Sequence, residues 1–182
     1  MSRFVVDASV AIKWCLPEPH DDCAARLRRE GTELDAPDLL YAEIGNTLWK
    51  RVRRGELTTE AAGGIVEAIS RLTIEVHPSR LLAGAALQVA CSTGLTVYDS
   101  LHLATALLTD SRLITADRRL FEAGRRKAPL RNRVLWVEDI PAYGYAHNST
   151  FGIPGDYCGN PLRINPLFPP LAKGERGFVW TV

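Results

Sequence analysis

The stretch Phe4–Val10, which reads FVVDASV, decides the fold of this 182-residue chain. Its first three residues form an apolar run that is too short for a helix and typical of a strand buried on both faces of a parallel sheet. Asp7 follows this run directly, and a carboxylate beside a buried strand costs solvation free energy unless another group compensates its charge. The sequence therefore predicts a parallel sheet with an acidic group at the end of its first strand.

From about residue 3 to residue 140, short β-rich runs alternate with segments of helical period, which indicates an α/β domain with a parallel sheet covered by helices. The expected strands are 4–6, 34–36, 73–77, 112–116 and 134–137, and the expected helices are 21–29, 37–54, 58–72, 78–94, 99–108 and 117–123. The run Leu95–Tyr98 reads as a short extended segment, after which Asp99 begins a helix.

Four acidic residues recur at the ends of these elements or within a helix: Asp7, Glu43, Asp99 and Asp117. Ligands of open α/β sheets bind at the carboxyl ends of the strands, where we expect these acids to meet. Carboxylates without a histidine or cysteine cluster suit hard cations such as Mg²⁺ or Mn²⁺, and such a centre cleaves phosphodiesters. Each acid also has a structural interpretation, as a helix cap at positions 7, 99 and 117 or as a surface charge at position 43.

Composition limits the function only loosely. The formal net charge of +1 gives no global signal for nucleic-acid binding, so an anionic partner would need a local basic patch or a metal. Four scattered cysteines read as reduced, small core residues of a cytoplasmic protein: Cys15, Cys23, Cys91 and Cys158. The N-terminus lacks a signal-peptide layout and the apolar run Leu81–Cys91 is too short to span a bilayer, so no membrane insertion is expected.

The last 42 residues differ from the rest of the chain. Residues 141–182 hold six of the eleven prolines and six of the fourteen glycines, without a helical or strand period. This predicts a domain over 1–140 and an irregular C-terminal extension over 141–182. The alternative is a partner-binding tail, because the segment contains aromatic residues along its length, among them Phe151, Tyr157, Phe168, Phe178 and Trp180.

Four motifs together resemble PIN-domain ribonucleases, in particular the toxin halves of VapBC-type toxin–antitoxin pairs. They are Phe4–Val10, the Pro37–Leu48 segment around Glu43, Tyr98–Ala106, and Leu113–Leu120 with its TAD triplet, all in the family's order. The resemblance covers about residues 3–140. It implies a Rossmann-like PIN domain with a parallel sheet of about five strands flanked by helices.

The resemblance also implies a Mg²⁺- or Mn²⁺-dependent endoribonuclease that leaves a 5′-phosphate and a 3′-hydroxyl. Its implied metal and catalytic residues are Asp7, Glu43, Asp99 and Asp117, with Ser9 and Thr115 in supporting hydrogen bonds. The implied partners are an RNA substrate, a cognate antitoxin protein and a second copy of the chain in a homodimer.

Two other functions compete with this one. A non-catalytic PIN-like module would bind RNA or protein, but it would need a broken acidic quartet. An aspartyl phosphatase would use Asp7 as a nucleophile, yet Ser9 stands where such an enzyme needs a second acid.

Several further residues carry two interpretations each. His102 is a packing residue or a proton-transfer group, and the packing role is favoured. The basic segments 125–133 and 50–54 are solvated surface, phosphate contacts or, for 50–54, contacts to an acidic antitoxin segment. For Trp14 and Trp49, core or dimer packing is favoured over base stacking.

Overall fold

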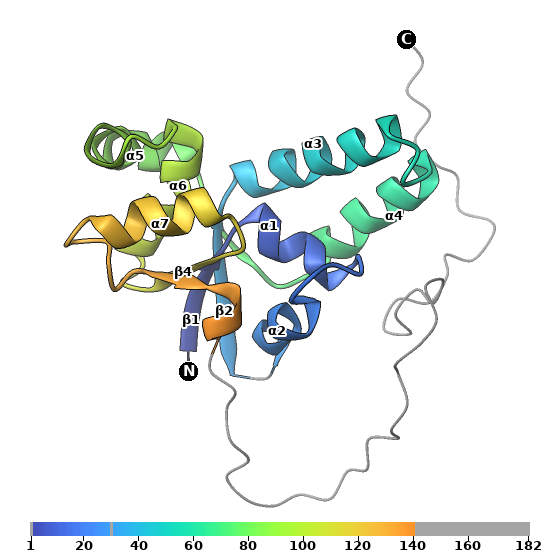
Figure 1. The fold of residues 1–182 in the computed structure, drawn as a ribbon, viewed down its shortest axis with the longest axis horizontal. Helices are drawn as coiled ribbons and strands as arrows, with labels where there is room; N and C mark the ends of the chain where they lie inside the picture. The colour runs from blue at the N-terminus through green and yellow to red at the C-terminus, as the bar shows by residue number, and fades with distance from the viewer. Residues whose placement is uncertain (1, 30, 141–182) are drawn as a thin grey trace, which may run out of the picture. The chain divides into compact units, whose positions relative to one another are not determined.

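The computed structural model describes residues 2–29 and 31–140, and this part of the chain contains the predicted parallel sheet (Figure 1). Its strands are β1 (Ser2–Val6), β2 (Thr32–Pro37), β3 (Glu75–His77), β4 (Arg112–Thr115) and β5 (Val134–Trp136). They pair in parallel in the order β3-β2-β1-β4-β5. The predicted α/β class and five-stranded sheet are confirmed. The predicted extension over 141–182 lies outside the described residues.

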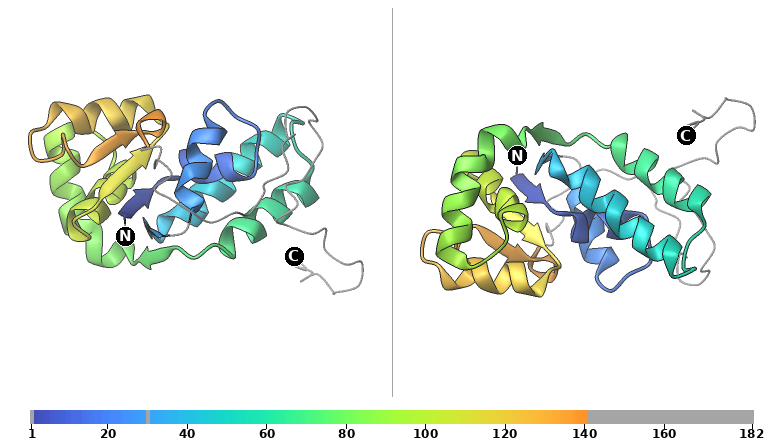
Figure 2. Two further views of the ribbon diagram at one scale, coloured as in Figure 1. Left: turned by 90° about the horizontal axis from the view of Figure 1, so that it is seen from below. Right: turned by 90° about the horizontal axis from the view of Figure 1, so that it is seen from above.

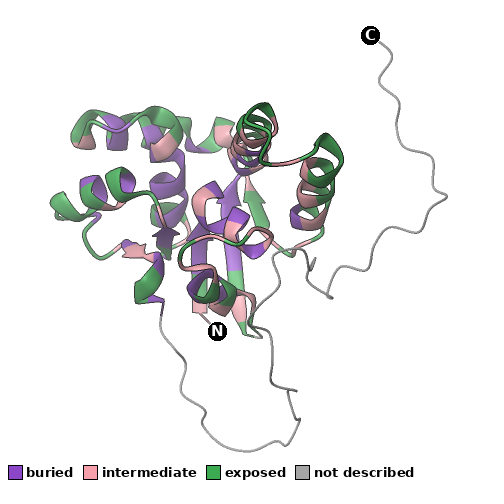
Figure 3. Cartoon of the chain, turned by 45° about the vertical axis from the view of Figure 1, so that its right-hand side comes forward, coloured by how far each residue is buried: buried purple, intermediate pink, exposed green. Residues whose placement is uncertain are grey.

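Alternate residues of the central strand β1 enter two different cores. Phe4 and Val6 pack in the core on one face of the sheet, whereas Val5 packs in the core on the other face. All three side chains are at most 1% exposed. Both faces are covered, as expected for a parallel sheet, and Figure 3 shows the buried central strands between partly exposed helices.

The helices divide between these two faces. They are α1 (Ala8–Ala11), α2 (Asp21–Ala25), α3 (Leu39–Arg53), α4 (Thr59–Ser70), α5 (Ser79–Thr93), α6 (Val97–Leu108) and α7 (Arg118–Arg126), with 3₁₀ turns at Ile12–Trp14, Arg26–Arg28 and Val137–Asp139. The helices α1 to α4 share the core of Phe4 and Val6, and α5 to α7 contribute to the core of Val5. Figure 2 shows α3 and α4 together on one side and α5, α6 and α7 on the other.

The prediction of an extended run at Leu95–Tyr98 is wrong, because α6 already begins at Val97. Thr96 has extended backbone angles and accepts a hydrogen bond from Asp99 N at 3.1 Å, which makes it the N-cap. Threonine is a favoured N-cap because its hydroxyl satisfies an otherwise unpaired backbone N–H. Asp99 therefore lies in the first turn of α6 and does not follow a strand. Its interpretation as a helix cap is also wrong.

The predicted core role of the cysteines holds for one of the three described. Cys23 is buried, Cys15 is partly buried and Cys91 is exposed, and all three are free thiols. Cys91 faces outward because the apolar stripe of α5 runs through other residues, of which Leu82 and Ala86 pack against α6. Cys158 lies outside the described residues.

The two tryptophans on the N-terminal half differ in the same way. Trp14 is buried, and its Nε1 donates a hydrogen bond to Ala24 O at 2.9 Å, so its predicted core packing is confirmed. Trp49 is 52% exposed, with the Arg53 guanidinium 5.1 Å from its ring centroid, so a core role for Trp49 is wrong. Its role in a dimer stays a prediction.

Within the described residues, no single helix combines the length and the apolar character needed to cross a bilayer. The pair α5 and α6 reaches that length and composition only when joined, and the two helices bend by 113° at their junction.

Candidate metal centre

All four acids that the sequence singled out line one cavity of about 230 Å³, together with Ser9, Asn46, Thr47 and His102. Asp7 and Asp117 follow strands β1 and β4, as predicted. Glu43 reaches the cavity from α3, as predicted, whereas Asp99 reaches it from the first turn of α6 and not from the end of an extended run. Four elements that are distant in the sequence thus contribute one carboxylate each to the same cavity.

Asp7 is the most deeply placed of the four, with 5% of its surface exposed. Its carboxylate accepts hydrogen bonds from Ser9 Oγ at 2.6 Å, Thr115 Oγ1 at 2.5 Å and Val10 N at 3.1 Å. The last bond caps α1, so the structural interpretation of Asp7 also holds. Burial raises the pKa of Asp7, although the charge of His102 and these hydrogen bonds act in the opposite direction.

A second buried carboxylate, that of Asp35, has the cationic partner that Asp7 lacks. Asp35, which is 0% exposed, accepts hydrogen bonds from Arg3 Nε at 2.6 Å and Arg3 Nη2 at 2.8 Å, and its other contact is His77 Nε2 at 2.6 Å. Asp7 has only hydroxyl and amide donors within hydrogen-bond distance among the described residues. The charge of Asp7 is therefore the less compensated of the two, which favours a cation in the adjacent cavity.

Glu43 is paired with His102 across the cavity wall. His102 Nε2 lies 2.9 Å from Glu43 Oε2, and His102 is 1% exposed. Burial lowers the pKa of His102, but the hydrogen bond to Glu43 and the negative charges of Glu43, Asp7 and Asp99 outweigh it and raise the pKa overall. The packing interpretation of His102 is confirmed by its burial, and a role in proton transfer stays a prediction.

The remaining two acids contact the start of α7. Asp99 Oδ2 accepts a hydrogen bond from Arg119 Nη2 at 2.8 Å, and the Arg119 side chain is 64% exposed. Asp117 is the N-cap of α7, because its Oδ1 accepts hydrogen bonds from Arg119 N at 2.8 Å and Leu120 N at 3.2 Å. The cap interpretation of Asp117 is correct, and the same side chain also lines the cavity.

The donor chemistry of this cavity fits a hard divalent cation, since its walls offer carboxylate, hydroxyl and amide oxygens. The described residues contain no group of three or more acidic, histidine or cysteine side chains that already converges on one metal position. Glu43 and Asp99 are instead held by His102 and Arg119. Each pairing uses one carboxylate oxygen, Glu43 Oε2 or Asp99 Oδ2, so the second oxygen of each acid remains for a cation, which would compete with Arg119 for the charge of Asp99.

Sequence reasoning missed several residues of this cavity. Asn46 and Thr47 line it from α3, three and four positions after Glu43, and this helical spacing is the signal that would have found them. The sequence carries no signal for the contact of Arg119 with Asp99, because this contact depends on how α7 packs beside α6.

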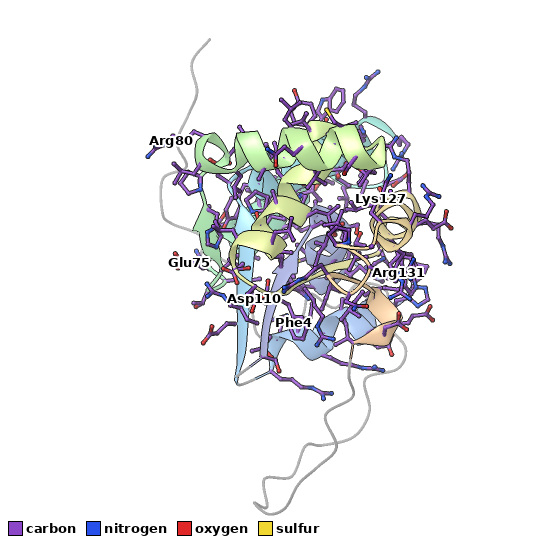
Figure 4. The ribbon with its side chains drawn as sticks, turned by 90° about the vertical axis from the view of Figure 1, so that its left-hand side faces the viewer. Phe4, Glu75, Arg80, Asp110, Lys127 and Arg131 are labelled. Atoms are coloured by element: carbon purple, nitrogen blue, oxygen red, sulfur yellow. The ribbon has the colours of Figure 1, made fainter. Side chains whose placement is uncertain are left out.

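The two predicted basic patches are partly engaged in local contacts. Arg125 Nη1 donates to Arg131 O at 3.1 Å, and Arg131 Nε donates to Arg125 O at 3.3 Å. Figure 4 shows Lys127 and Arg131 at one edge of the domain, away from Glu75 and Arg80. In the other patch Arg51 pairs with Glu18. Contact of either patch with RNA or an antitoxin stays a prediction.

Comparisons with known proteins show which family this chain matches. Residues 4–126 match the family model described as PIN domain. Ribonuclease VapC3 of Pyrobaculum aerophilum is 34% identical over 122 residues, which cover 66% of this chain and 93% of that protein.

Two solved structures share the fold. PAE2754 from Pyrobaculum aerophilum has a TM-score of 0.56 and 27% identity, with 75% of this chain and 85% of that chain covered. VapBC2 from Rickettsia felis, solved bound to a DNA fragment from its promoter, has a TM-score of 0.53 over 74% of this chain and 98% of that chain, and at 14% identity it supports the fold alone.

Proposed function

Because this chain belongs to the PIN domain family, we propose that it is a metal-dependent endoribonuclease and the toxin of a toxin–antitoxin pair. The proposed reaction is hydrolysis of RNA phosphodiester bonds with Mg²⁺ or Mn²⁺. The relative that is 34% identical is named a ribonuclease, which supports this substrate class.

One observation carries the proposal: four carboxylates line a single cavity, and the deepest of them, Asp7, has no cationic hydrogen-bond partner among the described residues. Without a cation, four negative charges would repel both one another and the phosphate of an RNA strand. Two of the four acids have a cationic partner: His102 for Glu43 and Arg119 for Asp99. Even when both partners are ionised, they offset only half of the four negative charges.

In the proposed mechanism, Asp7, Glu43, Asp99 and Asp117 hold the cation. A bound Mg²⁺ or Mn²⁺ supplies charge neutralisation at the scissile phosphate and lowers the pKa of its water ligand. Ser9 and Thr115 fix the carboxylate of Asp7 through their hydroxyl donors. His102 fixes Glu43 in the same way, so the protein contributes a pre-oriented set of oxygen ligands.

The same proposal includes the partners and the compartment. The motif resemblance to VapBC toxins and the 34% identity to Ribonuclease VapC3 support an antitoxin partner for this chain. The exposed apolar residues of α5 and α6 support a homodimer. A cytoplasmic location fits a chain whose described helices contain no single membrane-spanning candidate.

The substitution Asp7→Asn tests the metal site. Asparagine keeps an acceptor for Val10 N and a polar contact to Thr115, so the fold should survive while metal binding weakens. We expect at least a hundredfold loss of cleavage of a single-stranded RNA pool, on the scale seen when one essential electrostatic group is removed. Cleavage by the parent should stop on addition of a chelator, and calorimetry should show weaker Mn²⁺ binding by the variant.

Asp139→Asn is the matched control, because Asp139 is exposed in the last 3₁₀ turn and does not line the cavity. It should cleave like the parent. Full activity of Asp7→Asn with metal would contradict the site, and binding of RNA by the parent without any cleavage would favour the non-catalytic module.

A further inference from the structure

A second cavity, of about 280 Å³, adjoins the acidic one. The two cavities share three wall residues, Ala8, Ser9 and Thr47. When the scissile phosphate of an RNA strand lies in the acidic cavity, the nucleotide attached to that phosphate must lie directly beside this cavity. The second cavity is therefore positioned to receive part of the substrate next to the cleaved bond.

The walls of this second cavity combine apolar surface with one charged pair. Ala8, Ile12 and Ala116 provide apolar surface suited to the face of a ring. Lys13 and Glu18 provide polar groups, with Lys13 Nζ 2.9 Å from Glu18 Oε2. This mixture suits a planar heterocycle with a polar edge. A phosphate is disfavoured because the carboxylate of Glu18 would repel it.

The charged pair is held in place from outside the cavity. Lys13 and Glu18 expose only 8% and 18% of their side chains, and Arg51 of α3 donates a hydrogen bond to the other carboxylate oxygen of Glu18. A largely buried ion pair is weak evidence for a stabilising role, because desolvation offsets most of its attraction. Its position on a cavity wall gives it a second use, as a rigid hydrogen-bonding edge.

The donors and acceptors that remain free on Lys13 and Glu18 match the edge of one RNA base better than the others. Lys13 uses one of its three donors on Glu18, and Glu18 still has free acceptor positions on its two oxygens. Guanine is the RNA base whose Watson–Crick edge places one acceptor, O6, beside two donors, N1–H and the 2-amino group. A lysine next to a carboxylate matches that order, with the lysine on O6 and the carboxylate on the two donors.

We propose that this cavity is the subsite for the base next to the scissile phosphate, and that Lys13 and Glu18 select guanine there. The inference rests on the proposed nuclease function, since it assigns the base beside the bond that the acidic cavity would cleave. The three shared wall residues make the subsite continuous with the acidic cavity.

The test is cleavage of a random single-stranded RNA pool by the full chain with Mn²⁺, with sequencing of the new ends. The parent should enrich guanine at one position flanking the cut. In Glu18→Gln and in Lys13→Met, the ratio of cleavage beside guanine to cleavage beside other bases should fall on the order of tenfold. This ratio is a property of the active molecules, so it remains informative even if a variant folds less completely.

Glu56→Gln is the matched control, because Glu56 also contacts Arg51, at 3.7 Å, but does not line the cavity. It should keep the parent ratio. A defined RNA with inosine in place of that guanine lacks only the 2-amino group, and it should be cleaved severalfold more slowly by the parent but not by Glu18→Gln.

The outcomes separate the two proposals. If the parent cleaves the pool without a guanine preference, or if both variants keep the parent ratio, the subsite is overturned and the nuclease proposal stands. If the parent cleaves no RNA with either metal, the nuclease proposal fails and the subsite fails with it.

Discussion

Asp7 combines two requirements that oppose each other at a single residue. Its side chain is almost fully buried, and its hydrogen bonds come from neutral donors on Ser9, Thr115 and Val10. The hydrogen bonds fix its orientation, but the missing counter-charge leaves its ionised form costly in the metal-free protein. Asp35 avoids this cost by pairing with Arg3 and His77.

Stability without metal should therefore depend on pH through Asp7. The pKa of Asp7 is raised from an ordinary value of 3.8, so the folded protein keeps a proton that the unfolded chain has already released above that pH. The stability due to this proton is complete below pH 3.8 and is lost as the pH rises through the folded pKa. His102, raised from 6.5, contributes with the same sign at higher pH.

Asp7→Asn should remove the Asp7 part of this slope. In a chelator, its free energy of unfolding should exceed that of the parent at pH 7 by about 1.4 kcal/mol for each unit of the raised pKa, and the difference should disappear near pH 4. Urea unfolding of both proteins between pH 4 and pH 8 measures this. A variant that is less stable than the parent at every pH would contradict the assignment.

Arg119 should compete with a cation for Asp99. The ion pair is largely exposed on the arginine side, so it is worth at most about 1 kcal/mol. Arg119→Gln should tighten Mn²⁺ binding by up to about fivefold in calorimetry, whereas Arg131→Gln, at an exposed arginine that does not contact the acids, should leave it unchanged. Weaker Mn²⁺ binding by Arg119→Gln would mean that Arg119 supports the site.

At the scale of elements, helix starts decide where the acids lie. Asp99 is in the first turn of α6, which Thr96 caps, and Asp117 is itself the cap of α7. The N-terminus of each helix thus carries an acid into the cavity, where the helix dipole also favours negative charge.

The cap of α6 should matter for metal binding, and an identical cap elsewhere should not. Thr96 Oγ1 accepts from Asp99 N at 3.1 Å, and Thr58 Oγ1 accepts from Ala61 N of α4 at the same distance. Thr96→Ala and Thr58→Ala should each lower the free energy of unfolding by about 0.5–2 kcal/mol. Only Thr96→Ala should weaken Mn²⁺ binding, by severalfold, because fraying of this turn moves Asp99. Equal metal affinities would contradict this role.

The periodic patterns in the sequence predicted most of the helices and strands, but they did not predict the contacts between residues far apart in the chain. The apolar run at Phe4–Val6 predicted β1, and the helical period of residues 37–54 predicted α3. The start of α6 was missed because the apolar residues of 95–98 outweighed the cap signal of Thr96. The pairing of Glu43 with His102 joins residues 59 apart in the chain, and they meet only because α3 and α6 both pack against β2.

At the scale of the whole molecule, the sheet order explains how distant residues meet. Strands β1 and β4 are neighbours, so Asp7 and Thr115 contact each other although 108 residues separate them. The outer surface is less even: of the exposed large apolar residues described, six lie on α5 and α6, namely Leu81, Leu87, Val97, Tyr98, Leu107 and Leu108. Such a concentration is typical of a protein interface.

A homodimer through α5 and α6 should be sensitive to charge on these helices. Leu87 is 56% exposed, and Leu87→Asp should weaken dimerisation by at least about tenfold, since a charge at an apolar contact costs 2 kcal/mol or more at a central position. Light scattering over a concentration series measures this. Trp49→Asp tests the other predicted dimer contact, on α3, and should dimerise like the parent if α5 and α6 form the interface. A monomeric parent would refute the proposed dimer.

The burial of Asp7 also predicts how a mutant gene copy would affect a cell that carries the active copy. A residue that is 5% exposed contributes almost nothing to the face that a binding protein touches. Under the proposed toxin function, a gene copy with asparagine at position 7 would therefore encode an inactive chain that still occupies the antitoxin. In a cell that carries both copies, the inactive chain would act as a decoy, and the active copy would be released from its inhibitor at a lower level of expression.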